Sequence, residues 1–312
     1  MALLVQGEAS FTGRGRLMER PLKPYEDLFR EKGVAWKLED HILTVNGGRG
    51  YDALALDPGV YRLPGNVSSQ FFTGLLFVLP LLNGDSTLVS TTPLESRDYL
   101  EMTRQALAAA GVTTRWADEN TLCVPGGQTY QPFEAAVEAD WSQAAFWYAA
   151  DFLDSRVDIR GLNPDSAQGD KVVSELYWKL ARPGDAEIDV SGCPDLLPPL
   201  AVMAAVRSGT TRFTNAARLR IKESDRLSTT AALLAALGGR AEEGPDFLTV
   251  HGGPLTGGTV DSANDHRIAM AAAIAATGCT GPVTIRGAEC VQKSYPDFWE
   301  VYRSLGGDIH VL

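Results

Sequence analysis

The sequence predicts an α/β protein of two domains, built from repeated β-α-β-α-β-β units. The chain has 312 residues, which is longer than a typical domain with one compact core. Three segments also share one pattern: a helix that ends at glycine, a strand, a polar turn, a second strand and a pair of glycines. They are Glu31–Gly48, Ala109–Gly127 and Ala236–Gly253. Glycine suits a left-handed helix end, and a polar turn between alternating strands is typical of a hairpin.

Two further segments extend the repeat. The C-terminal SLGGDIHVL begins the same pattern and stops, and KLARPGDAEIDVSG is a shorter version of it. A single coincidence would be weak evidence, but five occurrences indicate repeated supersecondary units of roughly 60 to 70 residues each.

The first unit contains a strand in EASFTG and a helix from Pro21 to Lys32, followed by the first hairpin. Met1 to Gly7 then falls where the last turns of the unit's first helix belong. We therefore expect a strand and most of a helix to be missing ahead of residue 1. The alternative is that MALLVQG is a shortened first helix.

The second unit contains a strand in GVYRLPGN, a largely apolar helix from Ser68 to Leu82, a strand in DSTLVSTT and a helix from Ser96 to Gly111. Ser96 is a suitable N-cap. In the third unit, FEAAVEA and RVDIRGL occupy the strand positions on either side of a helix that begins at Trp141.

The fourth unit begins its two helices near Leu196 and Glu223. The fifth contains TVDSA, the helix DHRIAMAAAIAATG, the strand PVTIRGA and the helix PDFWEVYRSLGG.

Composition limits the classes of partner and compartment. The net charge of −11 argues against nucleic acid or an anionic membrane as the main partner. The four cysteines and four histidines show no metal-site spacing, so we expect no metal and a reducing compartment. The apolar stretch from Phe71 to Leu82 is too short to span a bilayer, and Met1 to Gly7 is no secretory signal. The chain is expected to be cytoplasmic.

Three clusters of polar residues open helices. Ser68, Ser69 and Gln70 place hydroxyl and amide groups at a helix N-terminus, which favours an anion, although plain N-capping explains them equally well. RIKESDR puts Lys222 and Arg226 on one helical face, where the simpler interpretation is a solvated charged helix start. NDHR, residues 264–267, suits a phosphate or carboxylate, or else Asp265 merely caps the helix.

The repeat strengthens the functional interpretation. Equivalent helix starts carry further polar residues, and symmetrically packed units would bring many of these starts to the same side of their domains. They are Ser68, Asp140, Asp195 and Asp265 in first helices, and Arg20, Ser96, Glu223 and Lys293 in second helices. A cleft lined by helix N-termini, arginine and lysine is suited to a polyanion.

These residues resemble the motifs of the 5-enolpyruvylshikimate-3-phosphate (EPSP) synthases, the 3-phosphoshikimate 1-carboxyvinyltransferases of the shikimate pathway of aromatic amino-acid biosynthesis. The matching segments occur in family order along the whole chain: ERP (19–21), GNVSSQFFTGLL (65–76), SRDY (96–99), PDLLPPLAV (194–202), LRIKESDR (219–226), NDHRIAMA (264–271) and CVQKSYPDFWE (290–300). KESDR together with DHRxAM is highly specific.

The resemblance implies a two-domain, inverted α/β barrel-like fold of six βαβαββ units, of which about four and a half would be present. Residues 1–138 would form an incomplete domain on the shikimate 3-phosphate side. Residues 139–312 would form the second domain, with the acid, the base and the phosphoenolpyruvate-binding residues. The two domains would close over the substrates.

The resemblance also implies the reaction: the enolpyruvyl group of phosphoenolpyruvate passes to shikimate 3-phosphate through a tetrahedral intermediate, phosphate is released, and no cofactor takes part. Asp195 would accept the hydroxyl proton and Glu223 would protonate the methylene carbon, with Lys222 and His266 beside them. Shikimate 3-phosphate would be held by Ser68, Ser69, Gln70, Ser96, Tyr99 and Lys222. Phosphoenolpyruvate would be surrounded by Arg20, Arg226, Arg267 and Lys293.

Two departures from the family pattern affect these expectations. The N-terminal lysine motif and the Gly-rich segment of the family have no counterpart here, and Arg218 stands where some members have an asparagine, so it receives no role. The chain could therefore be an inactive fragment, or one part of a split enzyme completed by an N-terminal fragment. Self-association is expected, because a missing unit would expose apolar faces. A UDP-N-acetylglucosamine enolpyruvyl transferase is the less favoured enzyme, since no cysteine lies in a comparable motif.

Overall fold

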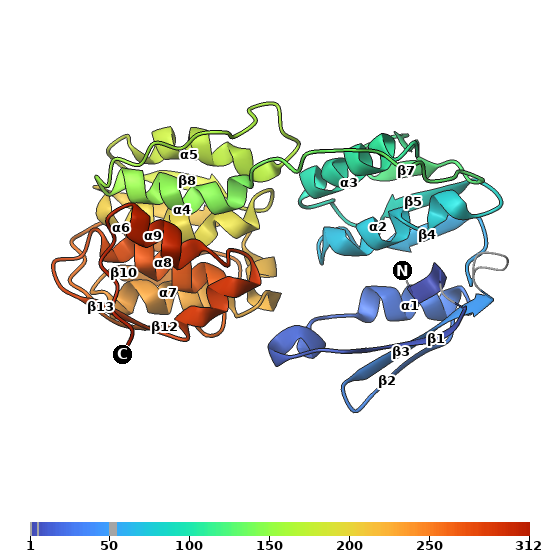
Figure 1. Cartoon of the computed structure of the whole chain (residues 1–312), viewed down its shortest axis with the longest axis horizontal. Helices are drawn as coiled ribbons and strands as arrows, with labels where there is room; N and C mark the ends of the chain where they lie inside the picture. Colours follow the sequence, from blue (N-terminus) through green and yellow to red (C-terminus); the bar gives the residue numbers. More distant parts are fainter. Residues whose placement is uncertain (1, 5, 50–54) are drawn as a thin grey trace. The chain divides into compact units, whose positions relative to one another are not determined.

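The computed structural model describes residues 2–4, 6–49 and 55–312. The chain forms two compact units, Met1–Ala136 and Val137–Leu312, and each has its own hydrophobic core (Figure 1).

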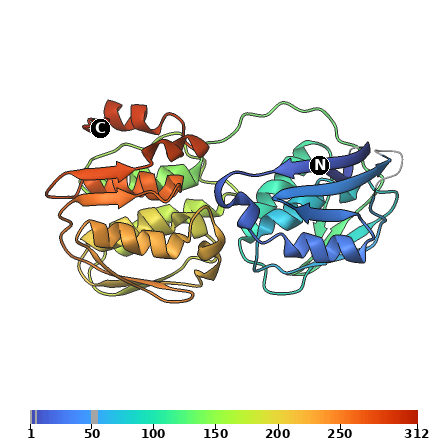
Figure 2. The same cartoon turned by 90° about the horizontal axis from the view of Figure 1, so that it is seen from below.

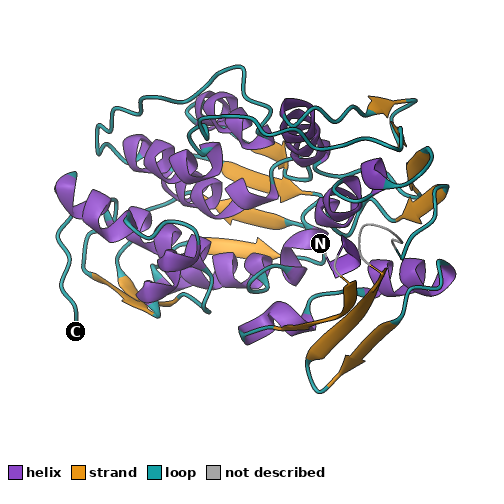
Figure 3. Ribbon diagram, turned by 45° about the vertical axis from the view of Figure 1, so that its right-hand side comes forward, coloured by secondary structure: helices purple, strands orange, loops and turns teal. Residues whose placement is uncertain are grey.

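The first sheet of unit 1 is antiparallel and has the strand order β1-β3-β2 (Figure 3). Its strands are β1 (Gln6–Thr12), β2 (Trp36–Glu39) and β3 (Ile42–Arg49). Asp40 and His41 join β2 to β3 with φ angles of 48° and 60°, as a two-residue hairpin turn requires. The first predicted hairpin is therefore confirmed. Helix α1 (Lys23–Glu31) precedes it, with Pro24 in its first turn, where the missing N–H costs nothing.

The second sheet of unit 1 has the order β4-β5-β7-β6, in which β4 and β5 are parallel and the other pairs antiparallel. Its strands are β4 (Val60–Leu63), β5 (Ser86–Ser90), β6 (Arg115–Trp116) and β7 (Thr121–Val124). Helix α2 (Ser69–Leu76) follows β4 and helix α3 (Arg97–Ala109) follows β5.

Unit 2 repeats this topology. Its four-stranded sheet has the order β8-β9-β11-β10, with β8 and β9 parallel. The strands are β8 (Ala186–Asp189), β9 (Thr210–Thr214), β10 (Arg240–Glu243) and β11 (Leu248–His251). Helix α6 (Leu197–Val206) follows β8 and helix α7 (Arg226–Ala236) follows β9. The described residues of each unit thus contain the predicted β-α-β-α-β-β order.

The remaining regular elements of unit 2 include a parallel pair of strands, β12 (Gly258–Asp261) and β13 (Val283–Arg286), beside helix α8 (His266–Ala276) (Figure 2). The other α-helices are α4 (Trp141–Phe152), α5 (Val173–Leu180) and α9 (Phe298–Ser304). Short 3-10 helices span Ala2–Leu4, Gly15–Glu19, Leu79–Leu81, Gly169–Val172, Pro194–Leu196, Ala217–Ile221 and Ala288–Lys293.

Helices rather than strands fill the core of unit 2. Residues 197–205 of α6 and 266–275 of α8 are all buried, as expected of helices that are apolar all round. The strands β8 and β12 bury a single residue each, Ile188 and Val260.

Two of the expected strands are not formed. Residues 133–139 (FEAAVEA) and 156–162 (RVDIRGL) are irregular. The first segment is exposed throughout, so no sheet face is buried there. The second packs Val157, Ile159 and Leu162 partly against the core, but no neighbouring strand pairs with it, and alternation alone does not make a strand.

The predicted helix from Ser68 to Leu82 is also shorter than expected. It ends at Leu76 and is followed by a separate 3-10 turn at Leu79–Leu81. Pro80 explains the break, because proline removes a helical N–H donor and its ring clashes with the preceding turn. In the described ranges, none of the helices is both long enough and apolar enough to cross a membrane.

Candidate active site

In unit 1, the predicted polar residues other than Arg20 gather where β4 and β5 end. Because these strands are parallel neighbours, the loops that follow them leave the same edge of the sheet. The loops are hydrogen-bonded to each other, since the Thr92 hydroxyl accepts from the backbone N–H groups of Gly65 and Asn66 at 2.9 and 3.1 Å. The starts of α2 and α3 are thereby brought together.

Ser68 is the N-cap of α2, and its hydroxyl accepts from the backbone N–H of Gln70 at 3.3 Å. Ser69 is buried at the first helical position, whereas Gln70 is exposed. Tyr99 is half-buried in the first turn of α3, and Arg20 is half-buried just after the 3-10 helix that precedes α1.

Ser96 precedes α3, but the prediction that its side chain caps the helix is wrong. Its φ of 54° places it in the left-handed region, and its hydroxyl makes no capping hydrogen bond. The capping geometry needs an extended N-cap residue. A serine kept in this conformation stores backbone strain, which is characteristic of functional positions.

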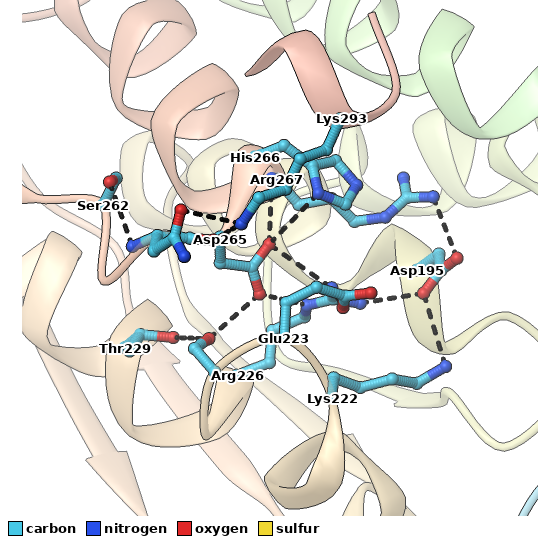
Figure 4. Close-up of polar contacts among 12 residues, drawn as sticks. Asp195, Lys222, Glu223, Arg226, Thr229, Ser262, Asp265, His266, Arg267 and Lys293 are labelled. Atoms are coloured by element: carbon cyan, nitrogen blue, oxygen red, sulfur yellow. Dashed lines mark hydrogen bonds and ion pairs between the residues drawn. The ribbon is translucent and has the colours of Figure 1, made fainter. Parts of the chain in front are cut away.

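In unit 2, four loops that each follow a parallel strand bring together most of the predicted residues (Figure 4). Asp195 follows β8, and Lys222, Glu223 and Arg226 follow β9. Asp265, His266 and Arg267 follow β12, while Lys293 follows β13.

Arg226 is the centre of this cluster, and its side chain is only 1% exposed. All three guanidinium nitrogens donate to carboxylates. Nε donates to Asp265 at 3.0 Å, Nη1 to Asp195 at 2.8 Å, and Nη2 to Glu223. Burial opposes the charge of Arg226, but the three carboxylates outweigh it and raise its pKa.

Asp195 bridges several cations. Its Oδ1 accepts from Arg226 and lies 3.7 Å from the Lys222 ammonium, and its Oδ2 accepts from Arg267 Nη2 at 2.9 Å. Burial alone would raise the pKa of Asp195, but Arg267, Lys222 and Arg226 together hold it well below its usual range. Desolvation lowers the pKa of the Lys222 ammonium, with repulsion from Arg226 and Arg218 added, although attraction to Asp195 opposes the change.

Asp265 holds the innermost position and is fully buried. Beyond its bond to Arg226, it accepts from the Ser224 hydroxyl at 2.9 Å and caps α8 by accepting from the backbone N–H of Arg267 at 3.0 Å. The sequence predicts Asp265 as a helix cap and as one of the polar residues at equivalent helix starts, and it predicts no role for Ser224. Nothing in the sequence pattern alone showed that this aspartate would also reach Arg226, 39 residues earlier.

His266 and Arg267 have unused hydrogen-bonding atoms. Arg267 Nη2 donates to Ser142 Oγ at 3.1 Å, whereas the buried Nη1 of Arg267 and Nδ1 of His266 have no hydrogen-bond partner among the described residues. Burial and the neighbouring Arg267 lower the pKa of His266 to about 4, so the ring is neutral at pH 7. Lys293 lies at the edge, where its Nζ donates to Asn264 Oδ1 at 2.7 Å.

This arrangement can bind a small polyanion and move protons beside it. Arginine forks pair with carboxylate and phosphate, and Asp195 and Glu223 are both partly accessible, with side chains 22% and 29% exposed. Among the residues the structure describes, no cluster of three or more His, Cys, Asp or Glu side chains could hold a metal ion.

The comparisons with known proteins agree on one family. The model of the family described as EPSP synthase (3-phosphoshikimate 1-carboxyvinyltransferase) matches residues 1–302. The 3-phosphoshikimate 1-carboxyvinyltransferases of Clostridium kluyveri and Clostridium acetobutylicum are each 43% identical to the chain. Each match covers 99% of this chain and 75% of the relative.

Two solved structures share the fold. The EPSP synthase from Acinetobacter baumannii matches with a TM-score of 0.76 and 24% identity, over 99% of this chain and 76% of that one. The enolpyruvyl transferase NikO from Streptomyces tendae matches with a TM-score of 0.71 and 18% identity, over 97% and 74%.

Proposed function

Because the chain belongs to the EPSP synthase family, we propose that it transfers the enolpyruvyl group of phosphoenolpyruvate to shikimate 3-phosphate and releases phosphate. The observation that carries the proposal is the cluster in unit 2, where Lys222, Arg226 and Arg267 converge on Asp195. Both substrates are multiply anionic, so a site with several cations suits them.

The reaction adds an alcohol across a vinyl group, which requires a base for the hydroxyl proton and an acid for the methylene carbon. Asp195 is the proposed base. It is ionised, and it can take the proton once substrate anions share the cations that now stabilise its charge. Glu223 is the proposed acid, and it accepts from Arg226 Nη2 beside the Nη1 that donates to Asp195.

The cations have separate proposed tasks. Arg226, Arg267 and Lys293 would hold phosphoenolpyruvate, and the unpaired Arg267 Nη1 is a donor available for its oxygens. Lys222, beside Asp195, would bind shikimate 3-phosphate and stabilise the developing charge. His266 is neutral and would act through hydrogen bonds rather than charge.

Residues 1–138 would supply the rest of the shikimate 3-phosphate site and residues 139–312 the acid and base. In the first part, the starts of α2 and α3 place Ser68, Ser69, Gln70, Ser96 and Tyr99 where the β4 and β5 loops meet. Arg20 would contribute a further cation for phosphoenolpyruvate. Backbone N–H groups and hydroxyls at helix starts are suited to a phosphate.

The test is phosphate release from phosphoenolpyruvate and shikimate 3-phosphate by this chain alone. We expect activity that falls about 100-fold or more in Glu223→Gln and in Asp195→Ala, while the exposed-carboxylate variant Asp158→Asn retains it. Activity with UDP-N-acetylglucosamine instead would contradict the proposed acceptor.

If the chain alone shows no activity, a second assay distinguishes a split enzyme from an inactive fragment. Activity restored by a polypeptide that carries the family's N-terminal lysine and Gly-rich motifs would indicate one part of a split enzyme. No phosphate release, either by the chain alone or with the added polypeptide, would refute the proposed activity and favour an inactive fragment.

A further inference from the structure

The carboxylates around Arg226 fall into two kinds, and this difference extends the proposed function, on which the inference rests. Asp265 is fully buried and contacts Nε at 3.0 Å and Nη2 at 3.3 Å. It is also fixed by Ser224 and by the first turn of α8. Asp265 is therefore a permanent partner of the guanidinium.

Asp195 and Glu223 lie on the opposite, accessible edge. They accept from Nη1 and Nη2, and their side chains are 22% and 29% exposed. This is the edge at which a ligand carboxylate would form two parallel hydrogen bonds with an arginine whose Nε side is already occupied. A ligand carboxylate cannot take both bonds while Asp195 and Glu223 keep them.

We propose that the carboxylate of phosphoenolpyruvate displaces Glu223 from Arg226, and that the released Glu223 takes up a proton from solvent and so becomes the general acid. Asp195 and Glu223 thus act as exchangeable substitutes for the substrate's own anionic group, whereas Asp265 does not.

The charged groups that face Glu223 determine whether it takes up a proton when the ligand binds. Arg226, Lys222 and the neutral His266 lie nearest to it, and Asp195, Asp265 and Arg267 surround them. When the ligand takes the Arg226 edge, Glu223 loses its closest cation and gains a negatively charged neighbour. Both changes favour the protonated form of a carboxylic acid.

Asp195 responds differently to the same event. It loses Arg226 but keeps Arg267 at 2.9 Å and Lys222 at 3.7 Å. It therefore stays ionised as the base while Glu223 becomes the acid. One displacement separates the two carboxylates into opposite roles, as the chemistry requires.

The protons balance in this sequence. Glu223 receives one proton from solvent on a carboxylate oxygen and gives it to the methylene carbon, where the electron pair of the C=C π bond forms the new C–H bond as the double bond becomes single. The acceptor hydroxyl loses its proton to Asp195 as its oxygen bonds to the adjacent carbon. No further acid, base or co-reactant is needed.

The test is isothermal titration of phosphoenolpyruvate alone into the full chain at pH 8, in buffers of different ionisation enthalpy. At this pH the phosphate group of the ligand, with a second pKa near 6, is already ionised and adds little proton exchange of its own. We expect net proton uptake on binding in the unaltered chain, and almost none in Glu223→Gln, which should still bind. Asp158→Asn, which removes an exposed carboxylate paired with Arg160, is the matched control and should keep the uptake.

The outcomes separate the two proposals. Binding without proton uptake overturns this inference and leaves the proposed function standing, whereas a chain that neither binds phosphoenolpyruvate nor releases phosphate from it, alone or with the N-terminal polypeptide, refutes the proposed function itself. Uptake that persists in Glu223→Gln assigns the proton to another group and overturns the role of Glu223. If Glu223→Gln does not fold, the pH dependence of binding to the unaltered chain is the test. Its affinity for phosphoenolpyruvate should weaken up to about tenfold per pH unit above pH 8. A pH-independent affinity overturns the inference.

Discussion

Replacing Asp265 with asparagine tests whether the buried Arg226 depends on its buried carboxylate. Asparagine keeps an acceptor for the start of α8, so the change mainly removes charge. Breaking a buried ion pair costs about 3–5 kcal/mol. Asp195 and Glu223 still neutralise Arg226 from the accessible edge, so we expect the lower end, about 3 kcal/mol. For a unit of roughly 180 residues this corresponds to a fall in Tm of about 6–12 °C.

Calorimetry of the full chain measures this change, with urea unfolding followed by tryptophan fluorescence as a second probe. The control is Asp158→Asn, whose carboxylate and Arg160 partner are both largely exposed and should contribute less than about 0.5 kcal/mol. A loss below about 1 kcal/mol, or one equal to that of the control, would refute the reasoning that Asp265 is the permanent partner of Arg226.

Four further predictions follow from other features. Ser96→Gly should stabilise the chain by about 1 kcal/mol in urea unfolding, because glycine accepts the left-handed backbone freely, yet weaken binding of shikimate 3-phosphate in titration. Arg226→Lys should raise the KM for phosphoenolpyruvate at least tenfold in steady-state assays, since an ammonium cannot replace the guanidinium fork; an unchanged KM contradicts this role. Because the pKa of His266 is lowered from 6.5 to about 4, the unfolded state binds a proton that the folded state does not. Stability should therefore fall by about 3 kcal/mol from pH 6.5 to 4, and less in His266→Asn, as measured by urea unfolding across that range. Phe11 and Ile42 are exposed on the first sheet, so sizing should show concentration-dependent association that Phe11→Ser reduces; a sharp monomer peak at high concentration counts against it.

The hairpins and the helix starts could be predicted because their signals are local. A helix-ending glycine, a polar turn and alternating strands depend on neighbouring residues only, and the predicted hairpins are formed at β2–β3, β6–β7 and β10–β11. The repeat then indicated which polar residues occupy equivalent positions. The repeat therefore predicts Asp195 and Glu223 among the residues of one cleft, and the resemblance to the family adds Arg226 and Arg267.

The expectations that failed depended on tertiary context. The segments 133–139 and 156–162 have a strand-like pattern, but a strand needs a paired neighbour, which sequence alternation cannot supply. Ser96 has the right residue type for a cap and the wrong backbone conformation for one. The contact between Asp265 and Arg226 joins two helix starts 39 residues apart, and only the packing of α7 beside α8 brings them together.

The ion-pair cluster of unit 2 has a kinetic consequence. Asp195, Glu223 and Asp265 balance the charges of Lys222, Arg226 and Arg267 within a few ångströms, so little of that positive charge extends into solvent. The chain as a whole has a net charge of −11. Phosphoenolpyruvate, which is a trianion, therefore meets a weakly repulsive field until it is almost in contact with the site. Added salt screens that field. Association with phosphoenolpyruvate should consequently become faster, not slower, as ionic strength rises, unlike the usual electrostatically steered capture of an anion by a basic site.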